Sequence, residues 1–311
     1  MFTLAHISDP HLAGWAVDNP LALVSKRITG FLSWRLKRVK VHRPEVLDLV
    51  VADVQAAKPD HIAVTGDLTN ISLFGEFAAA ATWLRRLGPP QTVTVVPGNH
   101  DAYVGLPWEK STGLWRDNMT GLMPGEALSP GTPERAVTGA DDFPFVRQRG
   151  PIALIGTSTA VPTLPFSAAG ELGQKQLQRL ADILERLGAA SLCRVLLIHH
   201  PPFVEGGGRR KSLRDHNALR EVLRQKGVEL ILHGHTHVAC LDRVATPDGI
   251  APVFGVPSAS ALPWHRKDSA GYNLYRIERA GDSWNIKVEL KTLAKDAKAV
   301  VPAGQMLLTV P

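Results

Sequence analysis

Residues 92–101 read TVTVVPGNHD, an apolar β-prone run that passes directly into the motif Gly98 to Asp101. In this motif Asn99 offers a neutral amide oxygen and His100 a proton donor or a cation. Asp101 offers a carboxylate that is able to orient the imidazole. The same arrangement of a β-prone run followed by polar side chains recurs along the chain. The other motifs are Asp9-Pro10-His11, Gly66-Asp67, His199-His200-Pro201-Pro202 and Gly234-His235-Thr236-His237.

The five motifs together indicate a metal centre. They supply three carboxylates, six histidines and one asparagine, and no thiolate. Such oxygen and imidazole ligands suit Mn, Fe, Zn or Co. The first and last motifs each space two candidate ligands i, i+2, so both side chains of a pair can face one ion. His199 and His200 present one imidazole to each side of the strand end, so we expect one ligand there. The set predicts two divalent metals and metal-assisted hydrolysis.

Strand and helix patterns alternate through most of the chain. Predicted strands cover residues 3–8, 60–65, 92–96, 152–157, 194–199, 229–233, 251–256, 272–278 and 284–290. Predicted helices cover 44–57, 73–87, 173–187 and 216–226, the third with an apolar stripe at Leu177, Leu180, Ile183, Leu184 and Leu187. We expect an α/β fold of mixed sheets with helices outside, forming one domain over residues 1–311. The motifs follow strand ends, where open α/β sheets place their ligand sites.

Two segments do not fit this alternation. Residues 102–150 are rich in Gly, Pro, Trp and Met, and we expect a long irregular connection beside the site. Residues 24–43 combine Phe31 and Trp34 with many Lys and Arg residues. We favour an ordinary surface helix with Phe31 and Trp34 packed inward. The alternative is a basic amphipathic segment that lies at a membrane interface.

Composition indicates the class of protein, the charge of its partners and its cellular location. The apolar share of 44% is ordinary for a globular protein, and the net charge of +6 favours anionic partners. Only two cysteines are present, Cys193 and Cys240, and we expect buried free thiols rather than a disulfide scaffold. The first residues are typical of a strand and not of a secretory signal, and no apolar run reaches the about 20 residues of a membrane span. We therefore expect a cytoplasmic protein.

The ordered motifs D-x-H, G-D, G-N-H-D, H-H-P-P and G-H-T-H resemble those of the calcineurin-like metallophosphoesterase superfamily over residues 9 to 237. The resemblance implies a four-layer α/β/β/α sandwich of two mixed β-sheets. It implies a first metal held by Asp9, His11, Asp67 and His237, and a second held by Asp67, Asn99, His199 and His235. His199 is preferred to His200 because the family's ligand directly ends the strand. His100 would face the phosphoryl oxygens or the leaving group, supported by Asp101.

The expected reaction is attack of a metal-activated hydroxide on phosphorus. Within the superfamily the chain is most similar to the branch of cyclic-nucleotide and glycerophosphodiester phosphodiesterases, partly because of the run Ser258-Ala259-Ser260. The alternatives are a membrane-associated nucleotide-sugar or lipid pyrophosphohydrolase of the UDP-diacylglucosamine type, and a phosphomonoesterase. A non-catalytic scaffold would be expected to have lost ligands, and this chain has the full set. A nuclease finds no support in a nucleic-acid module or a concentrated basic stripe.

Substrate contacts are expected from the loops. Arg209, Arg210 and Lys211 follow a run of glycines, and they could grip a second phosphate or an anionic head group. His200 is a further candidate beside the metals. The run Trp264-His265-Arg266-Lys267 has the same character, with an aromatic ring able to stack on a base. In each case a solvated basic turn is the competing interpretation.

Overall fold

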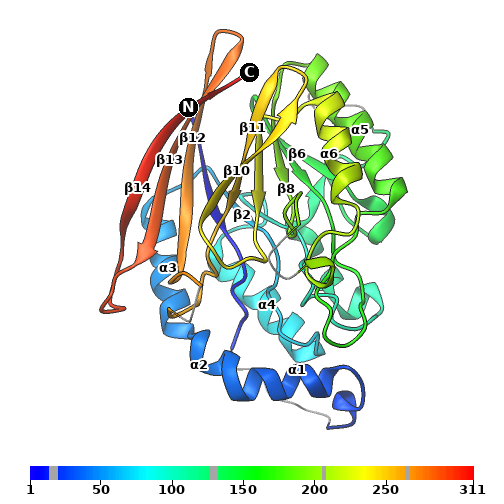
Figure 1. Cartoon of the computed structure of the whole chain (residues 1–311), viewed down its shortest axis with the longest axis vertical. Helices are drawn as coiled ribbons and strands as arrows, with labels where there is room; N and C mark the ends of the chain where they lie inside the picture. The colour runs from blue at the N-terminus through cyan, green and yellow to red at the C-terminus, as the bar shows by residue number, and fades with distance from the viewer. Residues whose placement is uncertain (14–19, 127–131, 205–207, 264–266) are drawn as a thin grey trace.

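The first of two large sheets carries the amino-terminal strands. The computed structural model describes residues 1–13, 20–126, 132–204, 208–263 and 267–311. In this sheet the order is β14-β13-β12-β1-β2-β3, with β1, β2 and β3 parallel and β12, β13 and β14 antiparallel (Figure 1). The strands are β1 (Phe2–Ile7), β2 (His61–Val64), β3 (Val93–Val95), β12 (Gly271–Ala280), β13 (Ser283–Leu293) and β14 (Val300–Val310).

The second sheet also has six strands, in the order β10-β11-β9-β8-β7-β6. Its central strands β7, β8, β9 and β11 are parallel, and β6 and β10 pair antiparallel at its two edges. The strands are β6 (Phe145–Arg149), β7 (Ile152–Gly156), β8 (Cys193–Leu197), β9 (Leu230–His233), β10 (Cys240–Thr246) and β11 (Gly249–Gly255). A small separate pair joins β4 (Thr120–Gly121) and β5 (Arg135–Ala136).

Helices cover the outer faces of both sheets, as Figure 1 shows for α5 and α6 on one side and α3 on the other. The α-helices are α1 (Arg27–Ser33), α2 (Val39–Val41), α3 (Pro44–Ala56), α4 (Phe74–Leu87), α5 (Gln174–Ala189) and α6 (His216–Lys226). Short turns of other helix types are η1 (Pro20–Leu23), η2 (Trp34–Arg38), η3 (Trp108–Lys110), η4 (Thr112–Asn118), η5 (Ala140–Asp142) and η6 (Gly208–Arg210). Within the described residues, no helix is both long and apolar enough to span a bilayer.

Three buried apolar layers hold this arrangement together. One fills the space between the two sheets, with side chains such as Leu4 and Leu197. The other two lie between a sheet and its helices, and the predicted stripe of α5 is buried in one of them. Burial of apolar area is the dominant favourable term in folding. The predicted four-layer α/β/β/α sandwich is therefore confirmed.

The sequence patterns missed the edge strands β6, β10 and β14. β14 contains Pro302, and most of its side chains are exposed, which is typical of a sheet edge. The connection over residues 102–150 does contain short irregular turns, as expected. It also supplies β6, and its Trp115, Phe143 and Phe145 are fully buried core residues. The expected long irregular connection is therefore found over most of these residues, but it ends in the strand β6. Cys193 is buried as expected, but Cys240 is only half-buried.

The segment 24–43 forms α1, a wide π-type turn at η2, and α2. Figure 1 shows α1 lying across the lower end of the molecule, beneath the sandwich. No residue of α1 is buried, and Phe31 and Trp34 are only half-buried, with their rings stacked at 6.0 Å. The expectation that these two rings pack inward is thus met only in part.

Candidate metal centre

The predicted metal ligands lie in loops at the carboxyl ends of parallel strands in both sheets. Asp9 follows β1, Asp67 follows β2 and Asn99 follows β3, whereas His199 and His235 follow β8 and β9. The two sheets meet at this edge because Ser8 and Ser258 form an isolated bridge. The hydroxyl of Ser258 also donates to the carbonyl of Asp9 at 2.6 Å. The sequence motifs from both halves of the chain are therefore brought together.

The backbone of these loops is unusual. Ten described non-glycine residues have positive φ, and five of them are predicted ligands: Asp9, His11, Asp67, His235 and His237. Such conformations cost roughly 1–3 kcal/mol each and persist only where the surrounding structure imposes them. Gly66 has a φ of +93°, and a Cβ there would lie 2.6 Å from the backbone nitrogen of Gly98. Strain and close approach are concentrated at the predicted site.

Asp67 occupies the middle of the cluster. Its Oδ2 lies 3.8 Å from Nε2 of His11 and 3.4 Å from Nε2 of His199. Its Oδ1 accepts the backbone N–H of His100 at 2.7 Å. One carboxylate oxygen thus lies between two imidazoles that were predicted to serve different metals.

Backbone carbonyls fix the tautomers of these two imidazoles. Nδ1 of His11 donates to the carbonyl of Thr69 at 3.1 Å, and Nδ1 of His199 donates to that of Thr65 at 2.6 Å. A carbonyl can only accept, so each Nδ1 carries a proton and each Nε2 is the ring nitrogen that faces Asp67. Nε2 of His11 is buried and has no hydrogen-bond partner among the described residues. An orphaned lone pair beside a carboxylate fits a cation.

The remaining predicted ligands lie near Asp67, on the sides of the two predicted metals. Oδ1 of Asn99 lies 3.2 Å from Nε2 of His199. Oδ1 of Asp9 lies 3.1 Å from Nε2 of His237, and its Oδ2 accepts the backbone N–H of His235 at 3.0 Å. Groups of three ligand atoms within 4.8 Å of one another include Asp9, Asp67 and His199. The donor set fits a pair of divalent ions, and the individual ligand assignments stay predictions.

The charges of the cluster are consistent with that donor set. Burial opposes ionisation of Asp67, but neighbouring His199 and His100 hold its pKa well below the usual range. Burial also opposes charge on His199, yet Asp67 and Asp9 raise the pKa of this imidazole to about 10, so without a metal its Nε2 carries a second proton that a bound cation would replace. Burial lowers the pKa of His11 well below its ordinary value, so its ring is neutral. Two ionised carboxylates would leave an excess of positive charge on two divalent ions, which suits an anionic substrate.

Asp101 has a different position from the one expected. Its Oδ2 accepts the backbone N–H groups of Asp67 and Gly98, both at 2.9 Å. Its Oδ1 accepts the N–H and the hydroxyl of Thr69 at 2.9 and 3.1 Å. Nδ1 of His100 donates instead to the carbonyl of Asn70 at 2.6 Å. The prediction that Asp101 orients His100 was wrong: this carboxylate ties together the loops after β2 and β3.

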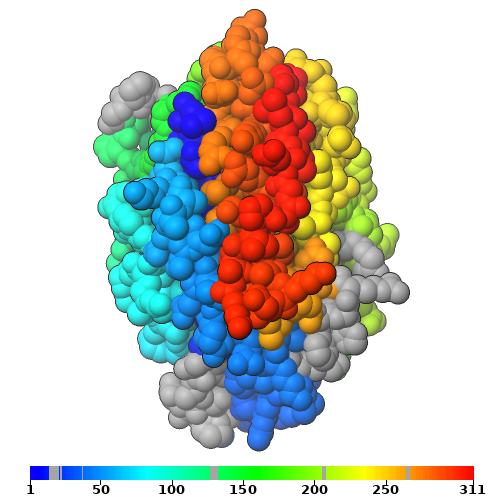
Figure 2. Space-filling view, turned by 90° about the vertical axis from the view of Figure 1, so that its left-hand side faces the viewer, coloured from blue at the N-terminus to red at the C-terminus, as the bar shows by residue number. Residues whose placement is uncertain are grey.

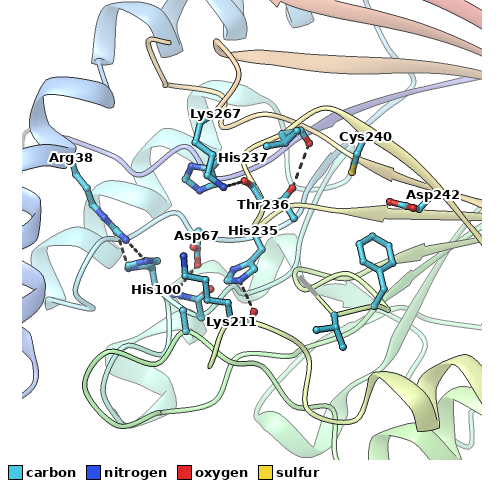
Figure 3. Close-up of a pocket in the computed structure, with 15 residues that line it drawn as sticks. Arg38, Asp67, His100, Lys211, His235, Thr236, His237, Cys240, Asp242 and Lys267 are labelled. Carbon is cyan, nitrogen blue, oxygen red and sulfur yellow. Dashed lines mark hydrogen bonds between the residues drawn. The ribbon is translucent and has the colours of Figure 1, made fainter. Parts of the chain in front are cut away.

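Two side chains that the motifs did not single out reach the site from the segment after α1. Arg38 donates to Nε2 of His100 at 2.8 Å, as the close-up in Figure 3 shows. His42 is buried, with its ring 4.6 Å from that of His11 and its Nδ1 2.8 Å from the hydroxyl of Ser260. The only signal in the sequence was the unusual density of cations around Arg38, which carries no information on a partner 62 residues away.

Comparison with known proteins agrees with this geometry. Residues 2–239 match the family model described as calcineurin-like phosphoesterase. The chain belongs to this family. It is 23% identical over 243 residues to a probable cyclic nucleotide phosphodiesterase from Synechococcus sp., a match that covers 77% of this chain and 80% of that protein.

Solved structures show the same fold. A dimetal phosphatase from Danio rerio aligns with a TM-score of 0.61 at 15% identity, over 100% of this chain and 99% of that one. A purple acid phosphatase from yellow lupin (Lupinus luteus) aligns with a TM-score of 0.55 at 11% identity, over 98% of this chain and 53% of that one. At these identities the likeness concerns the metallophosphoesterase fold. As a family member, the protein is a metal-dependent phosphoesterase hydrolase.

The candidate substrate residues divide into two groups. Lys211 lines the cavity beside the metal cluster, whereas Arg209 and Arg210 are exposed and do not line it. A role of Arg209 and Arg210 in substrate binding therefore stays a prediction. His200 uses both ring nitrogens, towards the hydroxyl of Thr159 at 2.7 Å and the carbonyl of Ala168 at 3.0 Å. It is fully buried, so it supports its neighbours rather than offering a free face to a substrate.

Lys267 lines the same cavity and donates to the carbonyl of Thr236. The residues that precede it in the candidate run, 264–266, lie outside the described residues, as do the glycines at 206 and 207. The cavity has a volume of about 650 Å³, within the range of small-molecule sites. A second cavity of about 260 Å³ shares Arg38, His100 and Lys211 with it and extends towards α1. Both cavities therefore adjoin Arg38 and His100.

Proposed function

We propose that the protein is a two-metal phosphodiesterase. In this proposal Asp67 bridges both metals. Asp9, His11 and His237 complete the first set, and Asn99, His199 and His235 complete the second. The observation that carries the proposal is the position of the Asp67 carboxylate oxygen, which lies 3.8 Å from Nε2 of His11 and 3.4 Å from Nε2 of His199. Two divalent ions held there would supply a nucleophile at neutral pH and neutralise charge on the phosphoryl group.

The chain's own residues would bind and orient the phosphoester. His100 and Arg38 stand at the wall of the cavity beside Asp67, and Figure 3 shows the side chain of Lys211 close to His100 and Asp67. Arg38 and Lys211 would hold the phosphoryl oxygens by charge-assisted hydrogen bonds. Nε2 of His100 accepts from Arg38 in the structure, so His100 would donate to a phosphoryl oxygen or to the departing oxygen as the imidazolium, once Arg38 has turned to the substrate. Asp101 would hold the loops that carry Asp67 and His100 in register.

Two observations support a diester as the substrate. The relative named as a probable cyclic nucleotide phosphodiesterase aligns over most of both chains. The main cavity, at about 650 Å³, has room for an organic group on each side of a phosphate.

A substrate panel tests this proposal. The protein is stripped with a chelator, reloaded with Mn²⁺ in excess, and assayed on bis-p-nitrophenyl phosphate and p-nitrophenyl phosphate. Cyclic nucleotides, glycerophosphodiesters and a nucleotide-sugar pyrophosphate complete the panel. We expect the diesters to be turned over fastest, with activity lost on stripping and regained on reloading. Turnover of the monoester alone, or of the pyrophosphate alone, would contradict the proposal.

Metal identity is addressed in the same experiment. Ligands of oxygen and imidazole type suit Mn, Fe, Zn and Co alike, so we propose no single one of them. Elemental analysis of the purified protein gives the stoichiometry, which we expect to be two ions per chain. A stoichiometry of one would remove the bridging role of Asp67.

A further inference from the structure

In the helical segment formed by α1 and η2, polar residues face the protein and apolar residues face the solvent. A surface helix ordinarily turns its apolar stripe towards the core. Here Arg27, Gly30 and Arg38 face inward. Arg27 donates to the carbonyls of Ile71 and Ser72 at 3.0 and 2.6 Å, and a Cβ on Gly30 would lie 2.6 Å from Ile71. The inward positions are thus polar or without a side chain.

The outward positions of the same segment are apolar. Val24, Ile28, Leu32 and Leu36 follow one another at intervals of four residues, which places them along one side of a helix. Their side chains are between 52% and 79% exposed. The π-type turn from Trp34 to Arg38 widens the helix where Leu36 points out and Arg38 points in. Such turns are frequent at functional sites.

The apolar surface continues beyond the helix. Leu164 and Phe166 are each 81% exposed. Their loop is joined to the start of α1 because Lys26 donates to the hydroxyl of Thr163 at 2.8 Å. Eight of the fifteen large exposed apolar side chains in the described part of the chain belong to this one end. They are Leu21, Val24, Ile28, Leu32, Leu36, Val39, Leu164 and Phe166. We call these eight residues the apolar end.

The charge around the apolar end is of one sign. Residues 20–43 contain seven Lys and Arg residues and no Asp or Glu. Three of them, Lys26, Arg27 and Arg38, bind other parts of the protein, whereas Arg35 and Lys40 are exposed. Phe31 and Trp34, which are half-buried and stacked, add the aromatic side chains that favour a membrane–water interface. An apolar stripe flanked by cations and aromatic rings is the pattern of a helix that lies flat on an anionic bilayer. A protein partner would need a complementary groove, whereas a bilayer accepts any convex apolar surface of this kind.

We propose that the apolar end docks the protein on an anionic lipid surface, with α1 lying in the plane of the headgroups. Docking in this orientation would also place a cavity of the active site near the lipid surface. The cavity of about 260 Å³ is lined by Lys26, Gly30 and Ser33 on the helix side and by Asn99 and His100 on the metal side. Docking would set the mouth of this cavity at the level of the lipid headgroups. Figure 2 shows the blue surface of this segment at the base of the molecule, away from the carboxyl end of β14.

Vesicle co-sedimentation tests the docking without any turnover, so it can fail while the phosphodiesterase proposal stands, and the reverse. Full-length protein is spun with vesicles of phosphatidylcholine alone and with vesicles that contain phosphatidylglycerol. We expect binding to the anionic vesicles only, weakening as salt is added because surface charges are screened. The absence of binding to anionic vesicles at low salt would overturn the proposal.

The variant I28D/L32D identifies the surface. We expect its partition onto anionic vesicles to fall by about tenfold or more, because two apolar side chains no longer enter the bilayer. The control is Leu307→Asp, which changes a side chain that is 68% exposed on β14. Figure 1 shows the carboxyl end of β14 at the opposite end of the molecule from α1. The thermal midpoint and metal content of both variants show that they are folded.

Two results would overturn the assignment of this surface. One is equal loss of binding in both variants, or no loss in I28D/L32D. The other is self-association: sedimentation velocity that shows a dimer of the wild type, lost in I28D/L32D, without any vesicle binding. The apolar end would then be an interface between two copies of this chain.

Discussion

The metal cluster and the segment from residue 20 to 43 meet at His100 but are built in opposite ways. In the cluster most side chains are buried, with His235 and His237 half-buried, and backbone carbonyls fix the imidazoles of His11 and His199. In the segment no residue of α1 is buried, and Arg27 holds the helix through two carbonyls. The mostly buried cluster carries the proposed chemistry, and the segment with the exposed helix α1 brings Arg38 to its edge.

This difference sets the size of the effects that substitutions should have. A change in the cluster removes a group that several buried neighbours need, so it is expected to abolish metal binding or turnover. A change in the segment leaves the strand ends intact and acts only on access and binding. The order of the predictions below follows from that difference.

The largest effect is expected for Asp67→Ala. The variant loses the carboxylate that lies between the two imidazoles, so we expect neither metal to be retained and turnover to fall to background. Elemental analysis and the diester assay measure both quantities. The control is Asp117→Ala, an exposed carboxylate outside the site. Two metals in Asp67→Ala would show that this residue is not the bridge.

His100→Ala separates chemistry from metal binding. Its ring is not needed to hold either ion in the proposed ligand sets, so we expect an unchanged stoichiometry. Turnover should fall by about 10²–10⁴-fold, the usual contribution of a group that assists proton transfer or transition-state charge. Full activity with both metals bound would remove this role. Loss of a metal would instead place His100 among the ligands.

Asp101→Asn tests the hydrogen bonds by which Asp101 joins the loops after β2 and β3. The carboxylate accepts from Asp67, Gly98 and Thr69, and an amide would turn an NH₂ group towards one pair of these donors. Because such outer hydrogen bonds orient ligands, we expect metal affinity to fall by about 10–100-fold together with a lower thermal midpoint. The control is Asp117→Asn. An unchanged affinity would mean that the loops keep their positions without this tie.

The sequence predicts those parts of the molecule whose structure depends on a pattern of neighbouring residues. Strands with continuous apolar runs and the amphipathic stripe of α5 were found because burial imposes their patterns. The metal motifs were found because each follows a strand in a short loop. β14 was missed because an edge strand buries little and so shows no alternation. The role of Asp101 was missed because its partners are backbone N–H groups, which leave no trace in side-chain types.

Arg38 and His42 illustrate a second limit. Both reach the cluster by tertiary packing of a segment whose own pattern indicated only a basic helix. The reversed polarity of α1 could not be seen in the sequence either, since spacing gives a stripe but not the direction in which it points. The segment 24–43 was correctly singled out as unusual. Which of its faces is exposed depends on contacts with Ile71, Ser72 and Tyr103, far along the chain.

The smallest effect is expected for Arg38→Met, which joins the two regions. Arg38 lines both cavities and donates to His100, but it belongs to neither proposed ligand set. Removing one charged donor to the phosphoryl group should raise KM by about tenfold with kcat and metal content nearly unchanged. Arg38→Lys keeps the charge and should recover part of the loss. Arg86→Met, an exposed arginine paired with Asp48, is the control.

The split between KM and kcat decides what Arg38 does. A residue that only props up the fold would lower the thermal midpoint and the metal content together, and a lysine would not restore it. A fall in kcat alone would mean that Arg38 acts through His100, because their hydrogen bond would then set the orientation of the ring. If KM rises alone, the segment from residue 20 to 43 supplies substrate binding, and the strand ends supply the chemistry.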